Sequence, residues 1–151
     1  MNAQREDAEV LYRARMIDEE AGLALIHVRD LATFCDPVAT PPWPGHDRPL
    51  EVDDLNGSTV CHLHQHAQRR PEHVVCVECD LSTVRWFAHD LDRVWASGPL
   101  HIDVGVFETP HWIVSDGNHR LAALILKNVP RVVVEFDGDI DLMRSMFLKT
   151  H

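Results

Sequence analysis

The chain has 151 residues, of which 45% are hydrophobic and 25% charged, as expected for one globular domain with a core of its own. Its formal net charge of -10 argues against tight nonspecific binding to DNA or to an anionic membrane, because both require a basic surface. No run of about 18 or more apolar residues occurs, and the polar, acidic N-terminus differs from a signal peptide. We therefore expect a cytoplasmic protein of one domain, 1–151, that does not bind membranes.

The first third of the chain predicts helices followed by a break. Between about Ala3 and Phe34 there is no proline, and apolar residues recur at roughly helical spacing. This predicts one long helix or two shorter ones in a helical section over 1–35. A proline-rich connector over 36–50 follows, and the polar, histidine-rich segment after it has no clear periodicity. The apolar stripe of the helical section would pack on the same domain or form a surface for a protein partner or an oligomer.

The remaining segment, 71–151, has clearer patterns. The run His73–Cys79 predicts a buried strand, and Ser82 is expected to cap a helix that ends at Gly98-Pro99. A hairpin, a helix, a strand and a last helix follow, predicted at Leu100–Phe107 with His111–Val114, Asn118–Lys127, Arg131–Phe136 and Ile140–Leu148. This order of strands and helices predicts an α+β fold.

The cysteines raise the question of a metal site. Cys76 and Cys79 have C-x-x-C spacing, and Cys61 with its neighbouring histidines could complete a zinc site, the histidines being His62, His64 and His66. A strand over His73–Cys79 would, however, place Cys76 and Cys79 on opposite faces. We therefore favour ordinary core cysteines over a zinc site, and in a reducing compartment we expect no disulfides.

The segment from Asp116 to Arg120, D-G-N-H-R, lies between a predicted strand and a predicted helix. The first amides of a helix lack partners within the helix and attract anions, and Gly117 lets a phosphate approach the backbone. Arg120 offers a fork of donors, and His119 offers a donor or a proton carrier. Asp116 could bind Mg²⁺ or orient a nucleophile. The alternative is an ordinary turn in which Asp116 caps the helix and Arg120 forms a surface ion pair.

From Leu100 to Phe136 the order strand, turn, strand, D-G-N-H-R-L-A-A, helix, V-P, strand resembles the core of the ParB/sulfiredoxin superfamily. The resemblance covers roughly Val74–Phe136 and implies a ParB/sulfiredoxin-like sheet with packed helices over 71–151. It also implies that the loop binds ATP or another nucleotide through Gly117, Asn118, His119 and Arg120. Asp116 would be the acidic partner of Mg²⁺ or of the nucleophile, and Asp116 and His119 would be the catalytic residues.

Two departures from that superfamily narrow the function. Asn118 stands where sulfiredoxins carry a reactive cysteine, which excludes their repair chemistry. The chain ends soon after the last strand, without room for the DNA reader of a ParB partition clamp. We therefore expect a Mg²⁺-dependent nucleotide hydrolase or phosphotransferase, with Asp103 or Glu108 as a second acid. The alternatives are a metal-dependent DNase and a non-catalytic regulatory module of plasmid or phage type.

Overall fold

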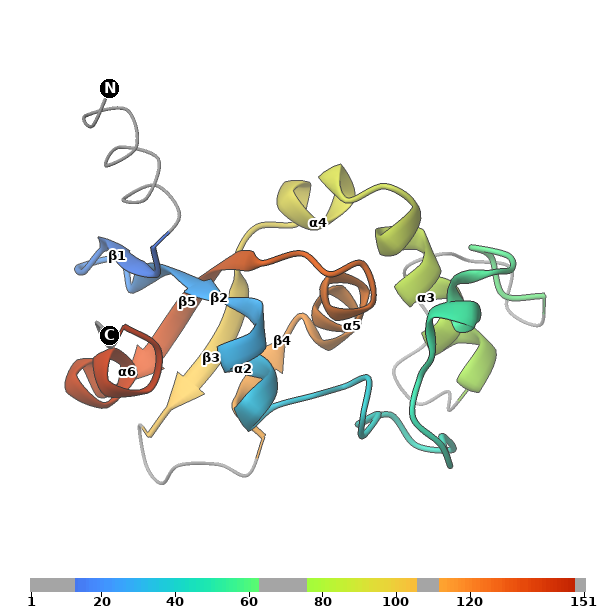
Figure 1. Ribbon diagram of the computed structural model, residues 1–151, viewed down its shortest axis with the longest axis horizontal. Helices are drawn as coiled ribbons and strands as arrows, with labels where there is room; N and C mark the ends of the chain where they lie inside the picture. The colour runs from blue at the N-terminus through green and yellow to red at the C-terminus, as the bar shows by residue number, and fades with distance from the viewer. Residues whose placement is uncertain (1–12, 63–75, 106–111, 149–151) are drawn as a thin grey trace.

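The computed structural model of the chain describes residues 13–62, 76–105 and 112–148 (Figure 1). Its centre is a five-stranded mixed sheet with the strand order β1-β2-β5-β3-β4. The strands are β1 (Arg15–Asp18), β2 (Leu23–His27), β3 (Leu100–Val104), β4 (Val114–Asp116) and β5 (Arg131–Gly138). The helices are α2 (Val28–Phe34), the 3-10 helix η1 (Val52–Leu55), α3 (Val77–His89), α4 (Asp92–Ala96), α5 (Asn118–Leu126) and α6 (Ile140–Phe147). The α+β class predicted from the sequence is therefore confirmed.

Strand β5 joins the two halves of the sheet. It pairs antiparallel with β2 on one side and parallel with β3 on the other. The outer pairs, β1 with β2 and β3 with β4, are both antiparallel. The last of these pairs is the predicted hairpin, and it sets His101 of β3 opposite Asp116 of β4.

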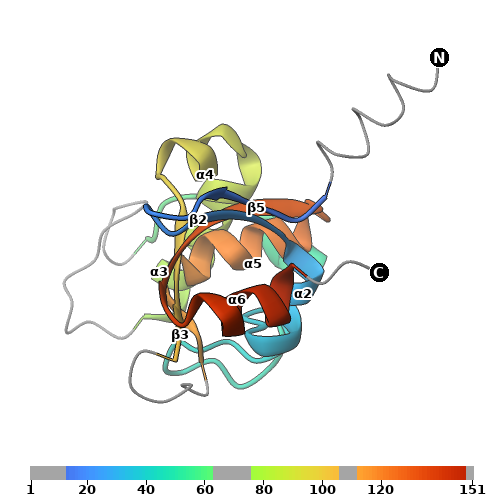
Figure 2. The same ribbon diagram turned by 90° about the vertical axis from the view of Figure 1, so that its left-hand side faces the viewer.

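The sheet buries one face, because alternate residues of β2, β3 and β5 are almost fully inaccessible to solvent. Helices α2, α5 and α6 lie on one side of the sheet (Figure 2). Helix α5 is buried along most of its length, and α3 packs against it (Figure 1). The N-terminus of α5 therefore lies where the sheet edge, α3 and the connecting loops meet.

The C-terminal elements follow the prediction closely. Helix α5 begins at Asn118 as expected, β5 begins at Arg131, and α6 begins at Ile140. Asp139 caps α6 by accepting hydrogen bonds from the amides of Asp141 and Leu142. The predicted turn that contains Glu108 lies outside the described residues.

The helical prediction for the N-terminal section is wrong over residues 13–27. This segment forms β1 and β2, and only Val28–Phe34 is helical. The apolar residues of β2 alternate between a buried and a partly buried face, a period of two that helical spacing partly imitates. Gly22 makes the turn before β2 with a φ of 70°, and a Cβ there would lie 2.7 Å from the carbonyl oxygen of Phe136. Residues 1–12, which include part of the predicted stripe, lie outside the described residues.

The strand prediction for His73–Cys79 is also wrong where the structure describes it. Cys76 is the N-cap of α3, and Val77 to Cys79 form the first helical turn. Ser82 lies inside the helix, where its hydroxyl donates to the carbonyl of Cys79, so it is not the predicted cap. The single helix expected up to Gly98 is two helices, since α3 ends at His89 and α4 begins at Asp92.

The proline-rich connector has no helix or strand between Cys35 and Glu51. Asp36 begins it by accepting hydrogen bonds from the amides of Val38 and Ala39. Trp43 and Leu50 are nevertheless buried in the main core. The connector therefore packs on the domain and places Trp43 beside the N-terminal end of α5.

Among the helices in the described ranges, none has the length and apolar character needed to cross a membrane.

Candidate functional site

The predicted phosphate loop joins the edge strand β4 to α5. Asp116 is the last residue of β4, and Gly117 is the N-cap of α5 with a φ of 110°. That left-handed conformation favours glycine, and a Cβ at this position would lie 2.4 Å from Cδ2 of Leu100. Gly117 therefore serves the turn and the close packing of α5 on β3.

The N-terminus of α5 has no side-chain cap. Leu121 is the first residue whose amide donates within the turn, to the carbonyl of Gly117. Within the described ranges, the amides of Asn118, His119 and Arg120 donate to no acceptor. Unsatisfied amides at the positive end of a helix dipole attract anions, so the geometry here is compatible with the predicted binding of a phosphate. The alternative prediction was that Asp116 caps this helix. No such hydrogen bond is found among the described residues.

Arg120 is buried under the loop, and its side chain is only 7% exposed. Its Nη1 donates to the carbonyls of Gly98 and Ser97 at 2.7 and 3.4 Å, and its Nη2 lies 3.6 Å from Oδ2 of Asp116. Burial lowers the pKa of Arg120, and the charge of Asp116 opposes that shift. Arg120 thus ties α5 to the turn after α4 and places a positive charge beneath the loop.

Asn118 also has partners within the fold. Its Oδ1 accepts a hydrogen bond from Nε1 of Trp112 at 2.8 Å, and its Nδ2 donates to the carbonyl of Val114 at 3.3 Å. The side chain therefore fixes the start of α5 against β4. Of the four predicted phosphate-binding residues, Asn118 and Arg120 have side chains engaged in these contacts, and Gly117 offers backbone only.

His119 contacts a buried carboxylate from another helix. Its Nε2 lies 2.9 Å from Oδ1 of Asp80, and Nε2 of His46 lies 3.0 Å from Oδ2 of the same residue. The side chain of Asp80 is 1% exposed, that of His46 is 4% exposed, and that of His119 is 28% exposed. A carboxylate buried this deeply needs such donors to offset its lost hydration.

Trp43 completes the group around His119. The two rings are stacked, with centroids 4.3 Å apart and planes 14° apart. Trp43 comes from the connector, Asp80 from α3 and His119 from α5, so three distant segments hold one imidazole. We call Trp43, His46, Asp80 and His119 the histidine–aspartate cluster.

Asp116 has an exposed side chain, as the predicted metal-binding carboxylate should. Of the two expected second acids, Asp103 lies two residues along β3 from His101, the residue opposite Asp116. This spacing corresponds to about 7 Å along the strand. Glu108 lies outside the described residues.

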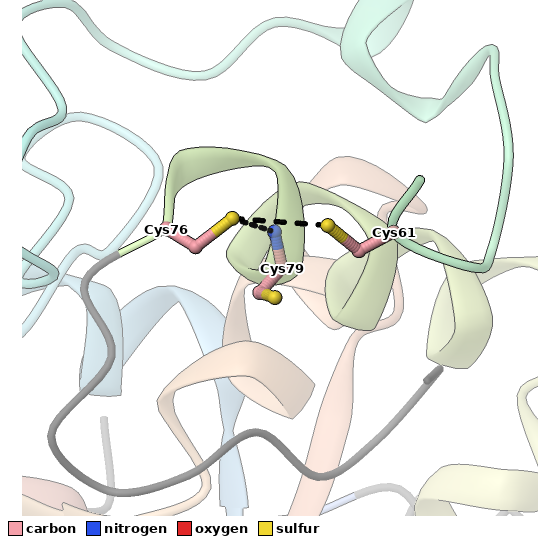
Figure 3. Close-up of side chains that lie close together, drawn as sticks. All are labelled: Cys61, Cys76 and Cys79. Carbon is pink, nitrogen blue, oxygen red and sulfur yellow. Dashed lines mark hydrogen bonds between the residues drawn. The ribbon is translucent and has the colours of Figure 1, made fainter. Parts of the chain in front are cut away.

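The cysteines show the largest departure from the sequence prediction. Because Cys76 and Cys79 flank the first turn of α3, they lie on the same side of the chain and meet Cys61 (Figure 3). The prediction that Cys76 and Cys79 lie on opposite faces of a strand is therefore wrong, and it no longer argues against a metal site. Cys35 lies elsewhere in the main core and accepts hydrogen bonds from the amides of Ile113 and Val114. Burial raises the pKa of its thiol.

A hollow in the described part of the chain lies away from the loop. It has a volume of about 640 Å³ and is lined by the junction of β2 with α2 and by the C-terminal end of α5. The unsatisfied amides of Asn118, His119 and Arg120 lie at the opposite end of α5, so this hollow is separate from the loop.

Comparisons with protein-family models, with curated proteins and with solved structures found no match to this chain.

Sequence reasoning identified the loop but missed the residues that support His119. Asp80 directly follows Cys79, the last residue of the predicted strand, and it is buried because a helix begins inside the C-x-x-C segment instead. Trp43 and His46 lie in a proline-rich segment, where an aromatic residue near a histidine was the only available signal.

Proposed function

We propose that the loop from Asp116 to Arg120 binds the phosphate groups of ATP or another nucleotide together with Mg²⁺. His119 then acts as the acid–base group in hydrolysis or transfer of the terminal phosphoryl group. The observation that carries this proposal is the position of His119 beside unsatisfied helix amides, with Nε2 held by the buried Asp80.

The amides of Asn118, His119 and Arg120 supply the binding of phosphate oxygens. They are preorganised by the helix, so they need little rearrangement when an anion arrives. The guanidinium of Arg120 adds positive charge from below without leaving its carbonyl partners. This arrangement gives the loop a local positive potential in a chain whose net charge of -10 otherwise repels a nucleotide.

Asp80 determines which nitrogen of His119 is available. An ionised carboxylate only accepts hydrogen bonds, so Nε2 of His119 carries the proton that it donates to Oδ1 of Asp80. With Nε2 held by Asp80, Nδ1 of His119 is the nitrogen left to accept a hydrogen bond, and within the described ranges no residue donates to it. A nitrogen in this state can take a proton from water or from an acceptor hydroxyl.

The site also fits the predicted metal. Mg²⁺ prefers oxygen ligands and commonly binds through one or two carboxylates together with substrate phosphates. The exposed carboxylate of Asp116, next to the amides, is suited to this role. Bound there, the ion would supply charge neutralisation on the phosphate oxygens.

The resemblance to the ParB/sulfiredoxin superfamily supports the same proposal. The succession of β3, β4, the D-G-N-H-R loop, α5 and β5 has the order that the resemblance implies. We propose a fold of that type for this segment and a nucleotide as the ligand on this basis.

The test is a calorimetric titration of the protein with ATP, CTP and ADP in the presence of Mg²⁺. Assays of phosphate release and of plasmid nicking follow. In a His119→Gln variant we expect phosphate release to fall by about 10²- to 10⁴-fold while nucleotide affinity changes little. His89→Gln is the matched control, because His89 is an exposed histidine of α3 whose Nε2 contacts the carbonyl of Leu55 and, among the described residues, no carboxylate.

Absence of nucleotide binding by the intact protein at millimolar ligand would refute the proposal. Plasmid nicking that requires Asp116 and a divalent ion, without nucleotide binding, would replace it with a nuclease. Nucleotide binding with no turnover would support the proposed binding site but contradict the catalytic role of His119.

A further inference from the structure

Three buried cysteines form a group separate from the main core. Cys61, Cys76 and Cys79 are 0%, 7% and 3% exposed, and they cluster with each other rather than with the aliphatic residues of the sheet and helices. Their sulfur atoms all lie within 4.8 Å of one another. Figure 3 shows Cys61 on a separate segment facing the first turn of α3, which carries the other two.

We propose that Cys61, Cys76 and Cys79 are ligands of a structural zinc ion. Zinc bound by cysteine takes tetrahedral geometry with Zn–S distances of about 2.3 Å, which places neighbouring sulfurs about 3.8 Å apart. The Sγ atoms of Cys61 and Cys76 are 3.7 Å apart. This separation is far longer than the roughly 2.0 Å of a disulfide.

The backbone around the cluster has the form that a thiolate site requires. Cys76 caps α3, and its sulfur accepts a hydrogen bond from the amide of Cys79 at 3.4 Å. A turn of this kind between two cysteines in C-x-x-C spacing directs both sulfurs to one point. The positive end of the α3 dipole favours the negative charge of three thiolates around a divalent ion.

Packing alone accounts less well for the cluster. Cysteines buried for their apolar character usually join a hydrophobic core, as Cys35 does. Here the sulfurs are gathered at one point, although Cys61 is separated from Cys76 by 15 positions in the chain. The three thiolates supply three of the four ligands of a tetrahedral zinc site. The fourth ligand is a group other than these three cysteines.

The zinc would stabilise the start of α3. Asp80 follows Cys79, and its backbone amide donates to the carbonyl of Cys76. An ion that fixes the first turn of α3 therefore also fixes the carboxylate that contacts His46 and His119. The zinc site does not depend on the proposed nucleotide chemistry.

The experiment begins with the full-length protein, purified under reducing conditions with and without added zinc. Metal analysis is expected to find about one zinc per chain. Replacement by cobalt is expected to produce the thiolate-to-cobalt charge-transfer absorption of a tetrahedral site. Zinc added afterwards should displace the cobalt and abolish that absorption.

Variants Cys61→Ser, Cys76→Ser and Cys79→Ser should each weaken metal binding by at least about tenfold and reduce the charge-transfer intensity. Cys35→Ser is the matched control, since it removes a buried cysteine outside the cluster and should retain the metal. Because misfolding of a serine variant would also abolish metal binding, a second readout uses the unaltered protein. There, zinc should protect three of the four cysteines from alkylation, and chelation of zinc should expose them.

Reduced, folded protein that binds neither zinc nor cobalt would overturn the proposal. Cobalt absorption that is unchanged in all three serine variants would also overturn it. Alkylation that proceeds equally at the three cysteines with and without zinc would have the same consequence. Nucleotide binding is measured separately, so failure of the zinc site and failure of the nucleotide site give different results.

Discussion

Nε2 of His119 lies 2.9 Å from Oδ1 of Asp80, although the two residues are 39 positions apart in the chain. The contact joins the first turn of α5 to the first turn of α3, and a second histidine, His46, occupies the other oxygen of the carboxylate. One buried acid therefore orients the imidazole beside the loop and stabilises the packing of the connector.

Removal of this acid should affect both stability and the protonation of His119. In Asp80→Ala, the buried Nε2 of His46 loses its acceptor, so we expect the free energy of unfolding to fall by about 1–3 kcal/mol. Urea denaturation measures this loss. Nitrogen NMR shifts should show His119 protonated at Nε2 in the unaltered protein and a mixture of tautomers in the variant.

Asp80→Asn is the corresponding control, because it retains the size of the side chain and one oxygen acceptor. It should lose less stability than Asp80→Ala. Equal stability of all three proteins, with unchanged histidine shifts, would contradict the structural role given to Asp80.

Gly117→Ala should destabilise the protein more than Gly98→Ala. Both glycines have positive φ, 110° and 83°, but a Cβ at Gly117 would lie 2.4 Å from Cδ2 of Leu100, whereas a Cβ at Gly98 would meet no atom within 4 Å. The difference between the two losses isolates the clash, and we expect about 1–3 kcal/mol by urea denaturation. Equal losses would mean that only the backbone conformation matters at Gly117.

Arg120→Lys should be costly although it keeps the charge. Lysine has one nitrogen in place of the two by which buried Arg120 contacts the carbonyls of Gly98 and Ser97 (Nη1) and the carboxylate of Asp116 (Nη2), so some of these contacts are lost. We expect the free energy of unfolding to fall by about 1–3 kcal/mol. Arg144→Lys, at an exposed ion pair with Glu19, should change it by less than about 0.5 kcal/mol. A loss of nucleotide binding in an Arg120 variant is interpretable only alongside this measurement.

The ion pair between Arg48 and Asp54 predicts a loss of stability in acid. Arg48 donates to both oxygens of Asp54, at 2.9 and 2.6 Å, and this hydrogen bonding lowers the pKa of the carboxyl. A carboxyl with a lowered folded pKa contributes stability that is complete above its unfolded value, about 3.9, and is lost as pH falls through the folded value. The stability difference between the protein and Asp54→Asn should therefore shrink below about pH 4.

Urea midpoints measured from neutral to acid pH test this expectation. Asp53→Asn is the control, because Asp53 is exposed, lies next to Asp54 and forms no ion pair among the described residues. A difference for Asp54→Asn that stays constant in acid would contradict the assignment.

The C-terminal elements could be predicted from sequence because local signals agreed with the tertiary structure. The apolar run after Arg120, the Val129-Pro130 stop and the Asp139 cap all mark boundaries within a few residues. The loop itself was identifiable from its position between a strand and a helix. Binding of nucleotide and Mg²⁺ there stays a prediction, as do the catalytic roles of Asp116 and His119.

The N-terminal part and the start of α3 could not be predicted in the same way. Strand β2 is a strand because it pairs with β5, about 108 residues further along the chain at Leu25 and Val133, and no local pattern records that pairing. The C-x-x-C segment and the two residues before it contain three valines, which favour a strand, yet the sulfur cap of Cys76 begins a helix. The contact of Asp80 with His119 depends on this helix start and on the packing of α3 against α5, and no local pattern in the sequence shows either of them.

The position of β5 in the sheet affects the order in which the chain can fold during synthesis. Strands β2 and β3 do not pair with each other, because β5 lies between them and pairs with both. Until residues 131–138 have left the ribosome, the sheet can exist only as two unconnected hairpins with exposed edges. Closure of the sheet is therefore a late event dominated by long-range pairing, which predicts slow folding for a domain of this size.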